Sequence, residues 1–341
     1  MSISLVDSRQ SAVFSRMSLI CAIMVVCLHV GSNDCVNTVA WWFLVVEKQI
    51  CKLAVPWFFL VAGYFLVNHY GEDHWYRDSI LSRVRSLALP YLFWCSLFSV
   101  YFIVVCSRKT GFWHVIEKNW VSFLGLDLIV APFYSSMWFI RSLMIFVLLS
   151  PIFIYLLRRL GWGVVVALWL ADFVFRLNYG MPSSGFFWFV FSLEGAAYFA
   201  CGIGLRLKLI SLPCVIYCTL FKTAMVLLMV VFLVLFSYAY LCGYPLFCFQ
   251  GLLIPCSMGA FFWLVSASAP KRNAYDQMSF PLFLIHGFVM NFVSAVVFTD
   301  SSSVMHLLLR VFSVLVISVI ITQGIRHNAP SWLMVLIYGG R

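Results

Sequence analysis

The stretch "ICAIMVVCLHVGSND", residues 20–34, is apolar for nine residues and then places His29 inside the same hydrophobic run. The composition of the chain explains this run, because 64% of its 341 residues are hydrophobic and only 10% are charged. A soluble domain carries about 25% charged residues. So much apolar surface does not fit into a water-soluble core and must face lipid. The stretch therefore predicts the end of a membrane-spanning helix, with an ionisable imidazole close to one membrane surface.

Runs of about 20 apolar residues recur along the chain and predict ten membrane-spanning helices. Runs of this length are typical of helices, because the strands of a membrane barrel need only about ten alternating residues. The predicted fold class is an all-α integral membrane protein, a bundle of about ten helices in a single transmembrane domain over residues 1–341. The predicted spans are 12–31, 52–69, 87–106, 133–156, 161–178, 186–205, 219–238, 245–265, 279–298 and 304–323.

The basic residues predict the orientation of the bundle, since cytoplasmic connections carry an excess of Lys and Arg. With the N-terminus inside, the inner connections hold most of the 22 Lys and Arg residues, so both termini are predicted to be cytoplasmic. The net charge of +10 then reflects topology and contact with anionic lipid rather than nucleic-acid binding. The sequence contains no Walker or dinucleotide-binding motif and does not indicate coupling to ATP.

Polar residues inside the spans are the strongest indication of function, because a charged group at the bilayer centre costs about 2.5–3.5 kcal/mol to insert. Four such residues are predicted at outer or middle depth, namely His29, Arg141, Glu194 and Arg310. A fifth, His286, is predicted in the inner half of its span. The first four are therefore expected to converge on one cavity open toward the periplasm.

Each of these residues also has a purely structural explanation, and the functional explanation is favoured most for His29. The side chains of Arg141 and Arg310 can snorkel to the outer headgroups. Glu194 can neutralise one of these arginines inside the bundle as readily as it can bind substrate. His286 can satisfy a hydrogen bond between helices.

Five segments, taken together, resemble the membrane-bound acyltransferase family 3 in their order and spacing. The resemblance covers essentially the whole chain, and it rests on the series, since no single segment is diagnostic. The segments are "RMSLICAIMVVCLHV" at 16–30, "VPWFFLVAGYFL" at 55–66, "SRVRSLALPYLFW" at 82–94, "MWFIRSLMIFVLLSPIF" at 137–153 and "SFPLFLIHGF" at 279–288.

This family includes O-acetyltransferases of bacterial surface polysaccharides, lipopolysaccharide O-antigen and exopolysaccharide. The resemblance implies that acyl-CoA, here acetyl-CoA, donates from the cytoplasmic face. It implies that the acceptor is a hydroxyl of a polysaccharide or lipid-linked glycan at or near the outer face. It also implies a place in the lipid bilayer of a bacterial inner membrane, with neither a metal ion nor nucleic acid as a partner.

The family's first span carries a basic residue, ten intervening residues and then a histidine, which corresponds to His29. The position of the basic residue is occupied by Ser18. Arg16 is the nearest substitute, but two residues turn a helix by about 200°. Arg16 is therefore assigned to donor binding only as a displaced replacement.

Arg83 and Arg85 are predicted in the cytoplasmic loop between the second and third spans. Arginine forks suit the phosphate oxygens of coenzyme A, so both residues are assigned to donor binding. Both would also serve the positive-inside rule without any role in binding.

The acceptor side is assigned to Asp34, Trp138, His286 and Arg310. Asp34 follows His29 in an H-x4-D pattern, which resembles that of the glycerolipid acyltransferases, and the resemblance implies a carboxylate that orients a histidine base. On a continuous helix the two side chains would point roughly 140° apart, so they meet only if the helix ends near residue 31.

The leading hypothesis is an O-acetyltransferase that modifies an exported carbohydrate, with His29 as general base. Burial at the end of an apolar helix is expected to keep this ring neutral and able to accept a proton. Arg141 and Glu194 complete the predicted catalytic set. The alternative is a multi-span transporter of a sugar-linked lipid or acyl group, because intramembrane charges also mark substrate paths. A third alternative is a structural or regulatory membrane subunit, but it would not explain the charged residues inside the spans.

Overall fold

The computed structural model describes residues 8–30, 50–111, 113–115, 117, 135–179, 192–210, 219–241, 247–268, 277–296 and 304–340. These residues form helices joined by short turns, which confirms the all-α class for the described part of the chain. The predicted site residue Asp34 lies outside it.

The described residues form thirteen α-helices and two short helical turns. In chain order they are α1 (Ser8–Val30), α3 (Ala54–Leu66), α4 (Trp75–Arg83), the π-helical turn η2 (Val84–Ala88), α5 (Leu89–Thr110), the 3-10 turn η3 (Ser135–Met137), α8 (Trp138–Leu148), α9 (Ser150–Leu160), α10 (Trp162–Tyr179), α12 (Leu193–Arg206), α13 (Thr219–Leu241), α14 (Phe247–Ala267), α15 (Ser279–Val296), α16 (Val304–Asn328) and α17 (Ser331–Tyr338).

Three helical stretches in the described part are long and apolar enough to cross a membrane, namely Gln10–His29, Trp75–Arg108 and Val304–Asn328. Helices α8 and α9 add a fourth if the bent pair is one span. Five further apolar helices are shorter. These helices support an integral membrane protein, and each predicted span overlaps at least one helix. The count of ten spans and the cytoplasmic termini remain predictions.

The predicted span 133–156 is not one straight helix, because α8 and α9 meet at Leu149 with a bend of 65°. Pro151 causes the break, since proline has no N–H for the carbonyl four residues earlier and disfavours a helical residue before it. That carbonyl belongs to Val147, and the Ser150 hydroxyl donates to it instead at 2.7 Å. The carbonyl oxygen of Val147 therefore keeps a hydrogen-bond donor at the bend.

The predicted loop containing Arg83 and Arg85 is also wrong, because α4, η2 and α5 form one continuous helical stretch. Pro90 has no N–H to give to the carbonyl of Ser86 four residues earlier. The chain accommodates this by widening into the π-helical turn η2 rather than ending the helix. Arg83 thus ends α4, and Arg85 lies in η2, so both arginines are held on helical backbone.

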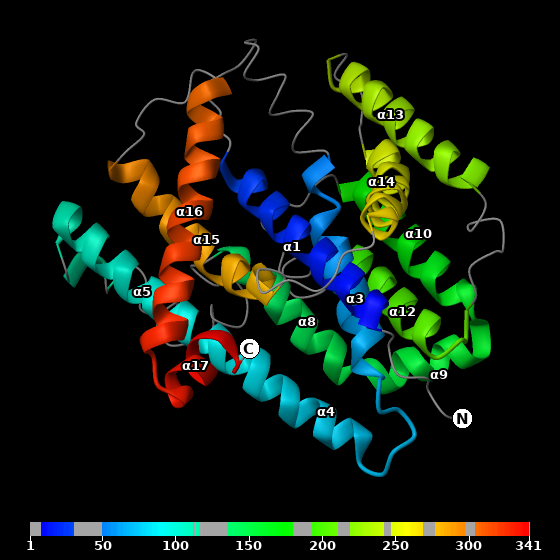
Figure 1. Ribbon diagram of the computed structural model, residues 1–341, viewed down its shortest axis with the longest axis horizontal. Coiled ribbons are helices and arrows are strands. Elements are labelled where there is room, and N and C mark those ends of the chain that lie inside the picture. The colour runs from blue at the N-terminus through cyan, green and yellow to red at the C-terminus, as the bar shows by residue number, and fades with distance from the viewer. Residues whose placement is uncertain are drawn as a thin grey trace.

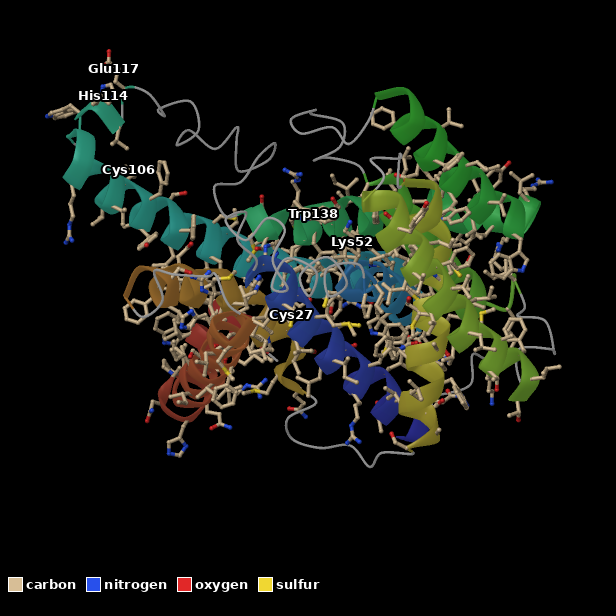
Figure 2. All side chains as sticks on the ribbon, turned by 90° about the horizontal axis from the view of Figure 1, so that it is seen from above. Cys27, Lys52, Cys106, His114, Glu117 and Trp138 are labelled. Carbon is tan, nitrogen blue, oxygen red and sulfur yellow. The ribbon has the colours of Figure 1, made fainter. Side chains whose placement is uncertain are left out.

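The bundle has two sides joined by a central set of helices. Figure 1 shows α10, α12, α13 and α14 on one side, α5, α15, α16 and α17 on the other, and α1, α3 and α8 between them. Figure 2 shows α5 running out of the bundle toward His114 and Glu117. Only its first half is packed, since Trp94 and Cys95 are buried whereas Val104 is 49% exposed.

The closest helix crossing in the centre joins α3 and α12. A Cβ atom at Gly63 would overlap the carbonyl oxygen of Phe199, and one at Gly202 would overlap that of Leu60. Small residues allow such backbone contact between membrane helices, where dispersion forces and close packing drive association. The crossing fixes α3, which provides one wall of the cavity described below.

Candidate active site

Two imidazole rings from distant parts of the sequence lie together. The ring centroids of His29 in α1 and His286 in α15 are 5.2 Å apart, with the ring planes at 35°. His286 is fully buried, whereas the His29 side chain is exposed. The expected burial of His29 is therefore wrong, and His29 is the accessible member of the pair. In the part of the chain that the structure describes, no group of three or more His, Cys, Asp or Glu residues is placed to hold a metal ion.

The buried ring of His286 is held by two neighbours. Its Nδ1 lies 2.6 Å from the carbonyl oxygen of Phe283, which can only accept, so Nδ1 carries the proton. Its Nε2 lies 3.5 Å from the hydroxyl of Ser136. Both ring nitrogens of His286 thus have a partner, which agrees with its structural explanation and gives His29 a fixed surface to pack on.

The predicted difference in depth between His286 and His29 is wrong, because the two rings lie side by side. Counting residues from the start of its span placed it in the inner half, far from the outer end of α1. In the structure, Met278 and Leu282 pack against Ala22 in the middle of α1. Helix α15 therefore begins beside the middle of α1, and His286 reaches the level of His29.

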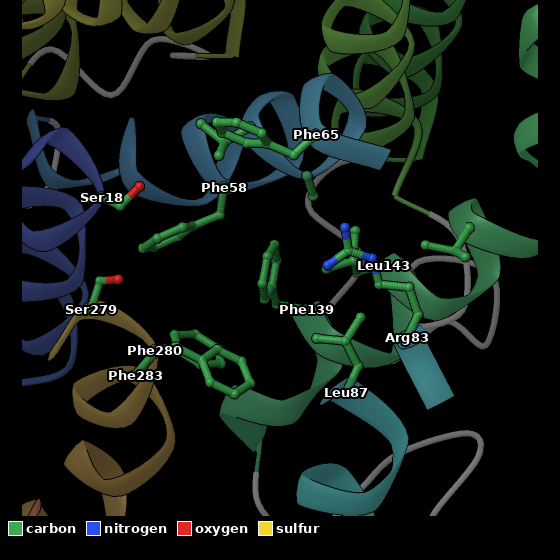
Figure 3. A pocket seen from close by; sticks show the side chains of 13 residues that line it. Ser18, Phe58, Phe65, Arg83, Leu87, Phe139, Leu143, Ser279, Phe280 and Phe283 are labelled. Carbon is green, nitrogen blue, oxygen red and sulfur yellow. The ribbon is translucent and has the colours of Figure 1, made fainter. Parts of the chain in front are cut away.

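A cavity of about 380 Å³ lies among α1, α3, η2, α8 and α15. This volume is at the small end of the range for ligand pockets. Figure 3 shows Arg83 on one wall and the hydroxyls of Ser18 and Ser279 on the opposite wall, with phenylalanine rings between them. Arg83 is the arginine of this wall, whereas Arg85 is exposed to solvent. The cavity therefore offers one cation, two hydroxyls and an aromatic middle.

A group of three aromatic rings separates this cavity from the histidine pair. Phe58, Phe139 and Phe283 all line the cavity, with ring centroids 5.4 to 6.3 Å apart. The ring of Phe283 also lies 5.9 Å from that of His286. Phe283 is consequently the residue through which the cavity and the pair of imidazoles are in contact.

Positions 16 and 18 of α1 differ in their relation to the cavity. Ser18 faces the cavity and accepts a hydrogen bond from the indole Nε1 of Trp57 at 3.2 Å. Arg16 lies two residues away on the regular helix α1 and is not among the described residues that line the cavity. The cation of the cavity therefore comes from Arg83, across from the position where the family has its basic residue.

Arg141 is fully inside the protein. Its side chain is 4% exposed in α8, within electrostatic range of Tyr91 and Cys95 of α5. Such burial excludes snorkelling to the headgroups as the reason for this arginine. Trp138, at the start of the same helix, is half-buried and lies with its ring 6.3 Å from that of Phe59.

Glu194 lies in the first turn of α12 rather than in the middle of a span, because the helix begins only at Leu193. It is within electrostatic range of Tyr198, which is also within range of Asp172 in α10. Arg310 is half-buried in α16. The described cavity is lined by none of His29, Arg141, Glu194 and Arg310, so the structure does not bring these four together there.

Three residues of the site had no signal in the sequence that marked them. Ser136 and Phe283 contact His286, and Ser279 lines the cavity. Serine and phenylalanine are common in apolar helices, so their residue types alone did not mark them; Ser136 reaches His286 from η3, and Phe283 lies one turn before it in α15.

Comparisons with known proteins identify the family of the chain. Residues 19–324 match the family model described as "Acyltransferase domain". The chain is 23% identical over 166 residues to the succinoglycan biosynthesis protein ExoH of Rhizobium meliloti (strain 1021). That alignment covers 45% of this chain and 45% of the relative, so the chain spans about half the length of this curated relative. No solved structure matches the chain.

The family match extends over nearly the whole chain and includes the histidine pair, Arg83 and every helix that lines the cavity. The match begins at residue 19, just after Arg16 and the cavity residue Ser18. The chain therefore belongs to the membrane-bound acyltransferase family 3.

Proposed function

We propose that this protein is an O-acyltransferase that transfers acetyl from cytoplasmic acetyl-CoA to a hydroxyl of an exported carbohydrate. One observation carries the proposal: the accessible imidazole of His29 packs on His286, one helical turn from Phe283 in the wall of an arginine-containing cavity. A base next to a donor cavity is what acyl transfer to a sugar hydroxyl needs. Family membership and the printed name of the relative, a polysaccharide biosynthesis protein, support the same class of reaction.

The cavity suits the arm of the donor. Coenzyme A carries its phosphates at one end of a narrow pantetheine arm and the thioester at the other. Arg83 is placed for a phosphate oxygen, because a guanidinium fork binds such oxygens through two N–H groups. We propose that Ser18 and Ser279, on the opposite wall, contact the amide groups of the pantetheine arm, and that the thioester lies toward Phe283, the lining residue nearest the histidine pair. The aromatic middle leaves room for a small acyl group such as acetyl.

His29 then acts as general base. It takes the proton of the sugar hydroxyl as the oxygen attacks the thioester carbonyl, and the carbon–sulfur bond breaks when the tetrahedral intermediate collapses. The coenzyme A thiolate leaves and takes up the proton from the imidazolium. His286 orients the His29 ring by packing. Arg141 is buried in α8, the helix that begins just after Ser136, the hydrogen-bond partner of His286, and we propose that its cation stabilises the acceptor or the developing oxyanion.

Purified protein in detergent, given labelled acetyl-CoA and a panel of surface glycans, tests the reaction directly. We expect a label covalently bound to glycan. A transporter would instead move a sugar-linked lipid or acyl group into proteoliposomes without forming a covalent product, and that result would replace the proposal. Succinyl-CoA in the same assay tests the donor, since a faster reaction with it would overturn the choice of acetyl.

Arg83→Gln is expected to raise the KM for acyl-CoA about tenfold or more, with little change in kcat or in the response to acceptor. The reason is that Arg83 lines the cavity and loses a charge-assisted bond to phosphate. Arg85→Gln is the matched control, because its side chain is exposed two residues away on the same helical stretch. If wild type and Arg83→Gln have equal KM values for acyl-CoA, Arg83 and Arg85 serve only as positive charges that set the membrane orientation.

A further inference from the structure

Helix α17 is anchored to the helical stretch that carries Arg83. The indole Nε1 of Trp94 in α5 donates to the carbonyl oxygen of Ile337 at 3.0 Å. Tyr338 is fully buried, and its hydroxyl donates to Thr322 of α16 at 3.5 Å. Burial raises the pKa of the Tyr338 phenol above its usual value, so this donor stays protonated. The end of α17 is therefore held from two sides.

The contact that follows α17 is made by backbone on backbone. Gly339 adopts φ +69°, and a Cβ there would lie 2.5 Å from the carbonyl oxygen of Ser86 and 2.6 Å from its Cα. The carbonyl of Ser86 is the one that Pro90 leaves without its helical N–H partner. Only glycine fits at position 339, both because of its φ and because of the Ser86 backbone.

Ser86 is the middle residue of η2, and the residues on either side of it reach the cavity. Arg83 precedes Ser86 by one helical turn and Leu87 follows it, and both line the cavity. π-helical turns are rare. They occur mostly as single-turn bulges inside α-helices, and frequently at functional sites. A shift of the Ser86 backbone therefore moves Arg83 and Leu87 together.

We propose that Gly339 is a positioning residue for donor binding: by seating α17 on Ser86, it holds η2 in the register that directs Arg83 into the cavity. This inference rests on the proposed donor role of Arg83. The residue acts only through η2 and contacts no substrate.

Gly339→Ala is expected to raise the KM for acyl-CoA about fivefold, with kcat and the KM for acceptor changed less than about twofold. Gly340→Ala is the matched control. Gly340 has a similar φ of +78°, so alanine is strained there as well, but its Cβ would meet only the side chain of Val335, at 3.4 Å. We expect the KM of this control to equal that of wild type. If Gly339→Ala does not fold, Trp94→Phe removes the bond to Ile337 more gently and should raise the same KM.

Combining Gly339→Ala with Arg83→Gln separates the two proposals. If Gly339 acts through Arg83, the double variant has the KM of Arg83→Gln alone, because the interaction being positioned is already gone. Fully additive effects on KM would overturn the inference, and so would equal KM changes in Gly339→Ala and Gly340→Ala. If Arg83→Gln itself leaves KM unchanged, the donor role of Arg83 fails, and with it the inference. A raised KM in Arg83→Gln beside an unchanged KM in Gly339→Ala would overturn only the inference.

Discussion

His29→Ala is expected to lower the rate of acyl transfer at least about 100-fold, while the protein stays folded, membrane-inserted and able to bind acyl-CoA. A sugar hydroxyl is a poor nucleophile at neutral pH, and an imidazole with an intrinsic pKa near 6.5 is suited to remove its proton. The exposed side chain of His29 can reach substrate, whereas that of His286 is fully buried. The measurement is acylated glycan formed per unit of membrane-inserted protein.

His286→Ala and Cys27→Ala are the controls for this experiment. His286 packs on His29 and is satisfied by Phe283, so its removal should lower the rate less, by loosening the base rather than deleting it. Cys27 lies two residues before His29 in α1 and should tolerate alanine. If His29→Ala retains transfer and His286→Ala does not, the roles of the two imidazoles are the reverse of those proposed.

The sequence predicted where helices form but not where they bend. Apolar runs report burial in lipid or protein, and each predicted span overlaps a helix. The break at Leu149 had a local signal in Ser150 and Pro151, which the length of the apolar run obscured. Pro90 did not end the helix that precedes it, and the chain widened at η2 instead, so the predicted loop at Arg83 and Arg85 is helical. A proline thus indicates a local defect, and packing decides which kind.

The sequence pointed to individual site residues but did not predict how they lie relative to one another. His29, His286 and Arg83 were predicted as site residues. The structure places His29 against His286, and His286 against Phe283, which lines the same cavity as Arg83. Their relative depth was not predictable, because residue counting assumes that every helix starts at the membrane surface. Helix α15 does not, since its first turn packs beside Ala22 in the middle of α1. The contact of Gly339 with Ser86 joins segments about 250 residues apart and has no local pattern at all.

Gly202→Ala is expected to destabilise the protein by at least about 3 kcal/mol and to abolish transfer together with folding. The new Cβ would overlap the carbonyl oxygen of Leu60 and lie 2.8 Å from the amide nitrogen of Tyr64, both of them backbone atoms of α3. A backbone cannot turn aside as a side chain does, so the two helices must separate. Phe58 and Phe65 on α3, which line the cavity, would move with it.

The matched control is Gly259→Ala in α14, where the nearest atom to a new Cβ is the side chain of Met225 at 4.0 Å. Alanine there meets open space and favours the helix by up to about 1 kcal/mol, so stability should be unchanged or higher. Thermal melting of both variants in detergent gives the comparison. A wild-type melting temperature for Gly202→Ala would mean that α3 and α12 do not approach as closely as described, and the position of the α3 wall of the cavity would then be wrong as well.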